Sequence, residues 1–286
     1  MNALPFFAVR HYRKVKAFTL VEVLVAELVF VILLGLSLFL SFAIIQSVQE
    51  EKKGMDSLGE ARLAMDRLSM DWAARVRRSD VPALFTKQTG NDQIGLLSQV
   101  PAYNGARQLS WVSYQVGTNS QVVAGSQLAS TYALQRGIVG FNWQSTDSGG
   151  NQLLTFPFVP SSVTVAPADY EPMANTVFRM EFCFLEQNTT NSSPFTVDSS
   201  LNLTSNNFVG VVVAVAALDQ RSRQIVTQAQ LTSMVTALKD VTADGVDPQS
   251  LWLPILNSTN FASTAGIPQS VAAAVHVFQR TFYLKD

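Results

Sequence analysis

Two glutamates lie inside a long apolar segment, where a carboxylate group has consequences for function. Glu22 and Glu27 belong to the stretch AFTLVEVLVAELVFVILLGLSLFLSFAII, which begins at Ala17. Because a carboxylate in hydrocarbon costs roughly 2.5–3.5 kcal/mol, each acid needs a cationic partner or a proton. If the chain were cleaved between Ala17 and Phe18, Glu22 would be the fifth residue of the product. The new α-amino group, of the same or of a neighbouring subunit, would then be a suitable partner for it.

Glu27 faces a different direction from Glu22. The five positions that separate the two acids turn a helix by about 140°. Two interpretations of Glu27 stay open. It is either an acid near the interface that is protonated or snorkels to water, or a second contact to a neighbouring helix.

The segment around these acids, residues 18–45, has the features of a single-pass membrane anchor. Residues 28–45 have no charge, and at ~1.5 Å per residue they cross most of a ~30 Å hydrocarbon layer. The preceding RHYRKVK, residues 10–16, is basic, so the positive-inside rule predicts a cytoplasmic N-terminus and an extracytoplasmic C-terminal bulk. A secretory signal peptide has a shorter apolar core that ends at a small-x-small cleavage site. The sequence therefore predicts an anchor.

The string KAFTLVEV, residues 16–23, resembles the class III prepilin signal of type IV pilins and type II secretion pseudopilins. The resemblance implies that residues 1–17 are a leader and that Ala17 is its last residue. Phe18 would be the N-methylated first residue of the mature chain, and Glu22 would be the glutamate used in subunit assembly. The family prefers glycine at the position of Ala17 and tolerates alanine there.

The same resemblance implies a structural role at the bacterial inner membrane. The chain would be a minor pilin or pseudopilin in a pilus-like or secretion pseudopilus fibre. Its partners would be prepilin peptidase, an inner-membrane assembly platform, other pilin-like subunits and membrane lipid. Narrower similarities are to minor pseudopilins of the J type, through WVSYQV and YALQRG, and to the Verru_Chthon cassette protein C group, through AFTLVEVLVA and VFQRTFYL. Whether the fibre serves secretion, adhesion, motility or DNA uptake stays open, as does a place at its tip or in its shaft.

The absence of proline between the leader and Pro82 predicts one long helix over about residues 18–78. Its second half, residues 46–80, has an apolar stripe at spacings of three and four, which predicts packing against a domain. In this half Asp71 and Arg75 have the i,i+4 spacing of a helical ion pair. The stripe consists of Met55, Leu58, Met65, Leu68, Trp72 and Val76.

Residues 81–286 have the pattern of a β-rich domain. Alternating apolar and polar residues predict strands over 109–116, 132–143 and 177–185. In the last of these, one face is expected to hold Phe178, Met180, Phe182 and Phe184. The apolar run 208–218 is typical of a strand buried on both faces.

Helical spacings in the same domain predict two helices. One covers residues 225–239, and the other is a C-terminal helix after Pro268. The C-terminal helix would place on one face Val271, Val275, Phe278 and Phe282. The predicted fold class is therefore α+β. By resemblance it is pilin-like, with a long N-terminal helix packed on a mainly antiparallel sheet.

Composition disfavours most enzymes and nucleic-acid-binding proteins. The chain has one cysteine, two histidines and a net charge of −1. These counts exclude an internal disulfide, disfavour a zinc site or a histidine triad, and provide no basic field for nucleic acid. No Gly-rich phosphate loop, G-x-S-x-G or H-E-x-x-H motif is present. We therefore expect no catalytic activity, no cofactor, no metal site and no nucleic-acid partner.

Two alternatives remain. The acidic loop of Asp240, Asp244 and Asp247 lacks the EF-hand pattern, so it is interpreted as a solvated turn, with calcium binding left open.

The alternative function is a permanently anchored extracytoplasmic domain that binds a ligand or acts as an enzyme. Such a domain would be expected to have a convergent polar pocket.

Overall fold

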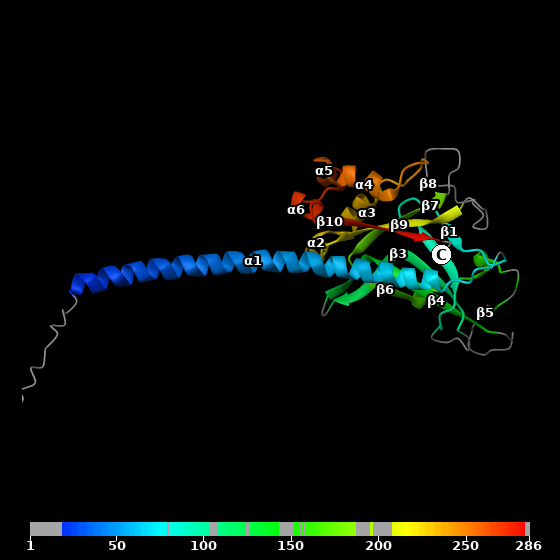
Figure 1. Cartoon of the computed structure of the whole chain (residues 1–286), viewed down its shortest axis with the longest axis horizontal. Coiled ribbons are helices and arrows are strands. Elements are labelled where there is room, and N and C mark those ends of the chain that lie inside the picture. The colour runs from blue at the N-terminus through cyan, green and yellow to red at the C-terminus, as the bar shows by residue number, and fades with distance from the viewer. Residues whose placement is uncertain are drawn as a thin grey trace, which may run out of the picture. The chain divides into compact units, whose positions relative to one another are not determined.

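The computed structural model of the chain describes residues 19–78, 80–102, 108–123, 126–142, 152–154, 156, 158–186, 195–196 and 208–283. The chain divides into two compact units, Met1–Glu51 and Lys52–Asp286. Within the first unit the described residues are helical from Leu20 onward. The second unit is an α+β domain whose elements are labelled in Figure 1.

Helix α1 covers Leu20–Ala73, so the predicted long helix is present but ends five residues earlier than expected. The reason is a competing backbone pairing. Beyond Ala73 the chain turns onto strand β2 (Gln93–Ser98), where Val76 N donates to Leu97 O at 2.8 Å and Gln99 N donates to Ala74 O at 2.9 Å. The residues after Ala73 thus exchange helical hydrogen bonds for bonds to a strand.

Two sheets make up the second unit. The first consists of β1 (Leu84–Thr86), β2, β3 (Ser110–Val123), β4 (Ser126–Asn142) and β5 (Gln152–Leu153) in that spatial order, with β6 (Tyr170–Ala174) also paired to β4. Its pairs are antiparallel except for β4 with β5. The second sheet has the order β10-β9-β7-β8 and is antiparallel throughout; its strands are β7 (Val177–Glu186), β8 (Phe195–Thr196), β9 (Phe208–Leu218) and β10 (Val275–Tyr283).

The four predicted strands are confirmed. They correspond to β3, β4, β7 and β9, and β9 is buried along Val211–Leu218, as expected for a strand covered on both faces. One detail of β7 differs. Phe178 is an extra residue in the pairing of β7 with β9, because Val177 lies opposite Ala217 and Arg179 lies opposite Ala216. This bulge turns Phe178 to the face opposite to that of Met180, against the prediction.

The predicted C-terminal helix is wrong. Only α6 (Gln269–Ala272) is helical, and Val275–Tyr283 forms β10, which pairs with β9 over its whole length. Phe278 and Phe282 do lie on one face, because a spacing of four residues places two side chains together on a strand as well as on a helix. The pairing is favoured because β9, buried on both faces, would otherwise have an open edge.

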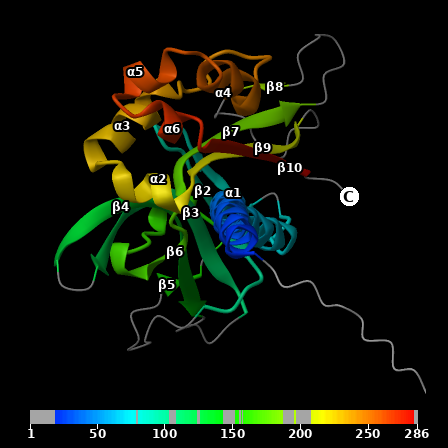
Figure 2. The ribbon, with the colours of Figure 1, turned by 90° about the vertical axis from the view of Figure 1, so that its left-hand side faces the viewer.

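Helices cover one face of the second sheet, as Figure 2 shows. They are α2 (Gln220–Ile225), α3 (Gln228–Ala237), α4 (Pro248–Leu256), α5 (Phe261–Ala265) and α6. The helix predicted over 225–239 is confirmed as α3, which begins at a capping box formed by Thr227 and Gln230. Together with β9, these helices enclose one apolar core around Trp252 and Phe261.

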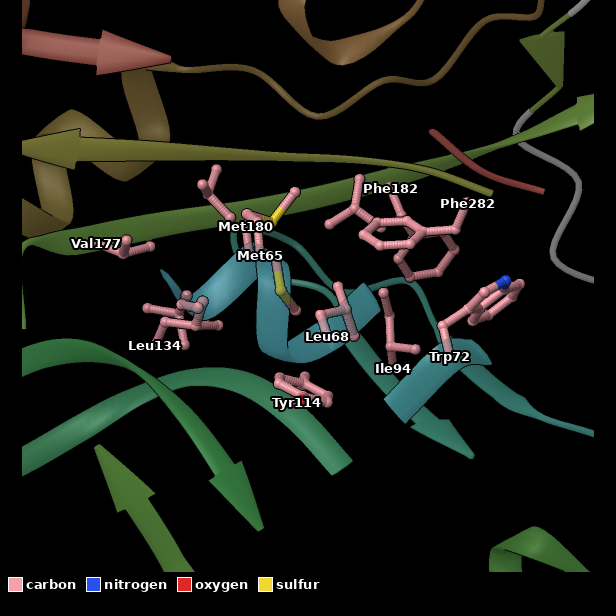
Figure 3. Close-up of a cluster of buried hydrophobic side chains, with 14 of the residues drawn as sticks. Met65, Leu68, Trp72, Ile94, Tyr114, Leu134, Val177, Met180, Phe182 and Phe282 are labelled. Atoms are coloured by element: carbon pink, nitrogen blue, oxygen red, sulfur yellow. The ribbon is translucent and has the colours of Figure 1, made fainter. Parts of the chain in front are cut away.

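The other face of the second sheet meets the first sheet across the C-terminal part of α1 (Figure 3). Three members of the predicted stripe, Met65, Leu68 and Trp72, are buried there, and Val76 lies beyond the helix. Ala61 and Ala64 are also fully buried. Trp72 Nε1 donates to Tyr283 O at 3.0 Å and so joins the helix to β10. The helix is therefore the central element of the main core.

Leu68→Ala should reduce the free energy of unfolding of the second unit by about 2–5 kcal/mol, because it opens a cavity between the two sheets. Leu63 is a matched control, since it lies on the same helix but is 70% exposed, against 3% for Leu68. Leu63→Ala should change stability by less than about 0.5 kcal/mol. Urea unfolding of the full chain in detergent, followed by tryptophan fluorescence, measures both. Equal effects of the two substitutions would contradict the packing described.

Candidate membrane and assembly segment

Among the residues that the structure describes, one helical stretch is long and apolar enough to cross a membrane. It is Leu20–Phe42, with a mean hydropathy of 2.8 and none of the window buried. Its 23 residues span about 35 Å, more than the ~30 Å hydrocarbon layer. A core helix of a soluble protein would be mostly covered by other elements, whereas the large apolar side chains of this stretch are exposed. Lipid is the environment that suits such a surface.

Glu22 closes a capping box with Thr19 at the start of this helix. The backbone N of Glu22 donates to Thr19 Oγ1 at 3.3 Å. Glu22 Oε2 in turn accepts from the backbone N of Thr19 at 3.0 Å and from Thr19 Oγ1 at 3.1 Å. The box satisfies backbone donors that the first turn of a helix leaves without partners. The T-x-x-E spacing is a sequence signal for it, and Thr19 was not among the predicted site residues.

The second carboxylate oxygen of Glu22 stays available. Glu22 Oε1 accepts no hydrogen bond from any residue that the structure describes. The predicted cleavage site, Ala17 and Phe18, lies outside the described residues. The amine predicted as the partner of Glu22 therefore stays a prediction.

Glu27 has no such local partner. Its side chain is exposed on α1, and it makes no hydrogen bond or ion pair with a described residue. Together with Glu22 it is one of the two charged residues in Leu20–Phe42. Of the two carboxylates, only that of Glu22 accepts hydrogen bonds from a residue at the start of its own helix.

At the other end of α1, Asp71 joins the helix to the first sheet. This carboxylate is 1% exposed and accepts from Arg136 Nε at 2.7 Å and from the Tyr114 hydroxyl at 2.5 Å. Arg67, one helical turn earlier, lies 3.7 Å away. Arg75, which has the i,i+4 spacing from Asp71, lies beyond the end of the helix, where its Nη1 donates to Trp72 O at 2.9 Å and its guanidinium lies over the Trp72 ring. Burial and the neighbouring Asp71 charge raise the pKa of Tyr114 well above its usual value, so its hydroxyl stays a donor.

Asp71→Ala should destabilise the second unit by about 3–5 kcal/mol, because it leaves Arg136 largely buried without its carboxylate partner. Asp66 provides the matched control, since it is also an aspartate of α1 paired to an arginine, Arg280, but the pair is exposed. Asp66→Ala should cost less than about 1 kcal/mol. The same urea titration measures both variants. A loss in Asp71→Ala no larger than that in Asp66→Ala would show that the buried pair is not the stronger attachment.

A second buried network joins the two sheets. Lys87, in the loop between β1 and β2, donates to Asp92 Oδ2 at 3.0 Å and to Glu181 Oε1 at 2.7 Å. Arg179 pairs with Glu181 and with Asp240. Asp92 also accepts from the backbone N of Phe182 on β7 at 3.0 Å, so the loop substitutes for a neighbouring strand there. Burial raises the pKa of both Asp92 and Glu181, because it disfavours their charged forms.

The predicted solvated acidic loop is therefore only partly correct. Asp244 is exposed, but Asp240 belongs to the buried network with Arg179, and Asp247 caps helix α4 by accepting from Ser250 N at 3.1 Å. Asp240 and Asp247 therefore have structural roles. Among the residues that the structure describes, no group of three or more His, Cys, Asp or Glu side chains could hold a metal ion.

Comparison of the chain with protein-family models, with curated proteins and with solved structures finds no match. Function therefore has to be argued from the residues themselves. The plain structural conclusion is an α+β chain with antiparallel sheets and one N-terminal helix suited to a membrane.

Proposed function

We propose that this chain is a structural subunit, a minor pilin or pseudopilin, of a membrane-assembled fibre. Prepilin peptidase would remove residues 1–17, and Phe18 would become the N-methylated first residue. The observation that carries the proposal is the string KAFTLVEV placed directly at the start of an exposed apolar helix. The combination of that helix with an antiparallel β-rich domain is also what a pilin-like subunit requires.

The proposed assembly step depends on the charge of Glu22. One carboxylate oxygen closes the capping box with Thr19, and the other is left for a second donor. In lipid an incoming subunit has an incompletely paired carboxylate, which is unfavourable. Docking beside a subunit whose Phe18 amine is exposed would form an ion pair in a low dielectric, where it is stronger than in water. Glu22 would thus select the register in which a subunit joins the fibre.

Orientation follows the charges that flank the helix. The basic residues 10–16 would keep the N-terminus in the cytoplasm, so the second unit would lie outside the inner membrane. Other pilin-like subunits, an assembly platform and lipid would be the partners of the helix. The chain would act by its surfaces and not by catalysis.

Mass spectrometry of the protein from a strain with an active prepilin peptidase tests the processing step. The expected mature chain begins at Phe18 and has one added methyl group on its amine. A variant with Ala17→Gly, which restores the residue the family prefers, should be processed at least as completely. A chain that retains residues 1–17 would overturn the proposal in favour of a permanently anchored domain.

Glu22→Gln separates the charge of this residue from its role in the cap. Glutamine closes a capping box as glutamate does, so membrane insertion and the helix start should be unchanged. Incorporation into the fibre, measured by crosslinking to neighbouring subunits in fractionated cells, should fall about tenfold or more, the effect of losing 1.4 kcal/mol or more.

Two further variants are controls for that result. Thr19→Val removes the hydroxyl of the cap and keeps the charge, so it should reduce incorporation much less than Glu22→Gln. Glu27→Gln should also have the smaller effect, because Glu27 faces elsewhere and matches no position of the motif. If Glu22→Gln and Glu27→Gln both incorporate as well as wild type, charge pairing does not direct assembly.

A further inference from the structure

A row of glutamines crosses the first sheet on the face that points away from α1. Gln93 on β2 lies directly opposite Gln115 on β3, and Gln115 lies directly opposite Gln135 on β4. Because side chains alternate between the two faces of a strand, these three share one face. Their neighbours Ile94, Tyr114 and Leu134 point into the main core instead. We call Gln93, Gln115 and Gln135 the glutamine row.

Gly137 allows the Tyr170 ring to lie close to the backbone beside this row. A Cβ atom on Gly137 would come within 2.8 Å of the Tyr170 ring, so that ring lies against bare backbone. From there the Tyr170 hydroxyl donates to Ser113 Oγ at 3.1 Å and accepts from Gln93 Nε2 at 3.0 Å. The ring therefore extends along the sheet and is held at its far end by two hydrogen bonds.

A cleft of about 560 Å³ lies over the row. It is bordered by the Pro160–Pro167 segment and has the size of an ordinary small-ligand site. None of the described residues that line it is charged. A second cleft of the same volume shares Gln93 and Gln115 with it and continues toward α3. The row thus lies at the junction of two clefts.

The row has hydrogen-bonding capacity that the described part of the chain does not use. Gln93 donates through its amide nitrogen to Ser113 and Tyr170, and its Oε1 accepts no hydrogen bond from a described residue. Gln115 Oε1 likewise accepts no hydrogen bond from a described residue. Gln115 Nε2 donates one long hydrogen bond, of 3.4 Å, to Gln135 Oε1. Two carboxamide oxygens are therefore open to hydroxyl donors.

We propose that the glutamine row and the Tyr170 ring form a binding site for a neutral oligosaccharide that lies across strands β2, β3 and β4. Adjacent strands are ~4.8 Å apart, a spacing on the order of one pyranose ring, so the amides of Gln93 and Gln115 would meet neighbouring sugar units. Gln135 is buried, accepts from Gln115 Nε2 and donates to Thr118 O, so it positions the Gln115 amide. The Tyr170 ring supplies an apolar surface for the face of a sugar. The uncharged lining disfavours phosphate-containing or acidic ligands.

An extended peptide fits the row less well. Its residues repeat every ~3.3 Å, which does not match glutamines that leave the sheet from strands ~4.8 Å apart. A peptide added in register with the strands would need an open sheet edge, and the row lies on a sheet face. The spacing of Gln93 and Gln115 across paired strands therefore favours the saccharide.

Calorimetric titration of the full chain tests the site. The protein is kept in a zwitterionic detergent without a sugar headgroup, and the probes are cellohexaose, maltohexaose, laminarihexaose and hexa-N-acetylchitohexaose. At least one should bind. Gln115→Ala and Tyr170→Ala should each weaken that binding about five- to tenfold, the effect of one hydrogen bond or one ring contact. Gln224→Ala, which removes an exposed glutamine of α2, should leave it unchanged.

Three results would overturn the proposal. The first is that none of the four saccharides binds at millimolar concentration. The second is that Gln115→Ala and Gln224→Ala bind the saccharide equally well. The third is that an uncharged peptide rich in serine, threonine and asparagine binds in a manner that requires Gln115 while the saccharides do not, which would make the row a peptide site. Urea unfolding of each variant separates lost binding from lost folding. The assay uses purified protein, so its outcome is independent of fibre assembly.

Discussion

Asp71, buried between helix α1 and the first sheet, is the point on which the arrangement of the second unit depends. Its carboxylate accepts hydrogen bonds from Arg136 and Tyr114, which belong to strands more than 40 residues away in the sequence. A buried carboxylate is tolerable only when its lone pairs are used, and here an arginine and a phenol use them. The interaction is directional, so it determines the rotation and height of the helix against the sheet. The apolar contacts of Met65 and Leu68 would by themselves allow some sliding.

The same helix has two chemically different ends. At Trp72 it is enclosed by aromatic rings from both sheets, and its indole is bonded to the last residues of β10. At Thr19 it is held by a capping box, beside a stretch whose large apolar side chains are exposed. One end is therefore stabilised by packing and the other by local hydrogen bonds. That division is consistent with the proposed subunit, which would fold as a domain and present an apolar helix to lipid or to other helices.

The connection between the two sheets is polar where the helix does not reach. Lys87 and Asp92 bind the backbone of Phe182 and the side chain of Glu181. The loop thereby protects a part of β7 that, on this side, pairs with no strand in the described part of the chain. Because the loop leads directly into β2, the same contacts position Gln93 and the polar face that follows from it.

Local patterns in the sequence were sufficient for part of this structure. The charge-free run after Glu27 and the alternation in β3 and most of β7 depend on near neighbours alone, because helix and strand periods arise from backbone geometry within a few residues. The nearly continuous apolar run 208–218 likewise predicted a strand buried on both faces, because a half-exposed strand would alternate apolar with polar residues. The position of Glu22 in an apolar context needed no tertiary structure to be recognised.

Other features were decided by contacts between distant residues. The last residues of the predicted helix gave way to pairing with Leu97, and the tail from Val275 became a strand because β9 offered an edge, although its spacing of four suited a helix equally. Phe178 changed faces through a bulge that only the pairing with Ala216 and Ala217 creates. The glutamine row has no signal in the sequence, because its members are 20 residues or more apart. Register between strands is a property of the folded sheet, and it alone brought these amides into line.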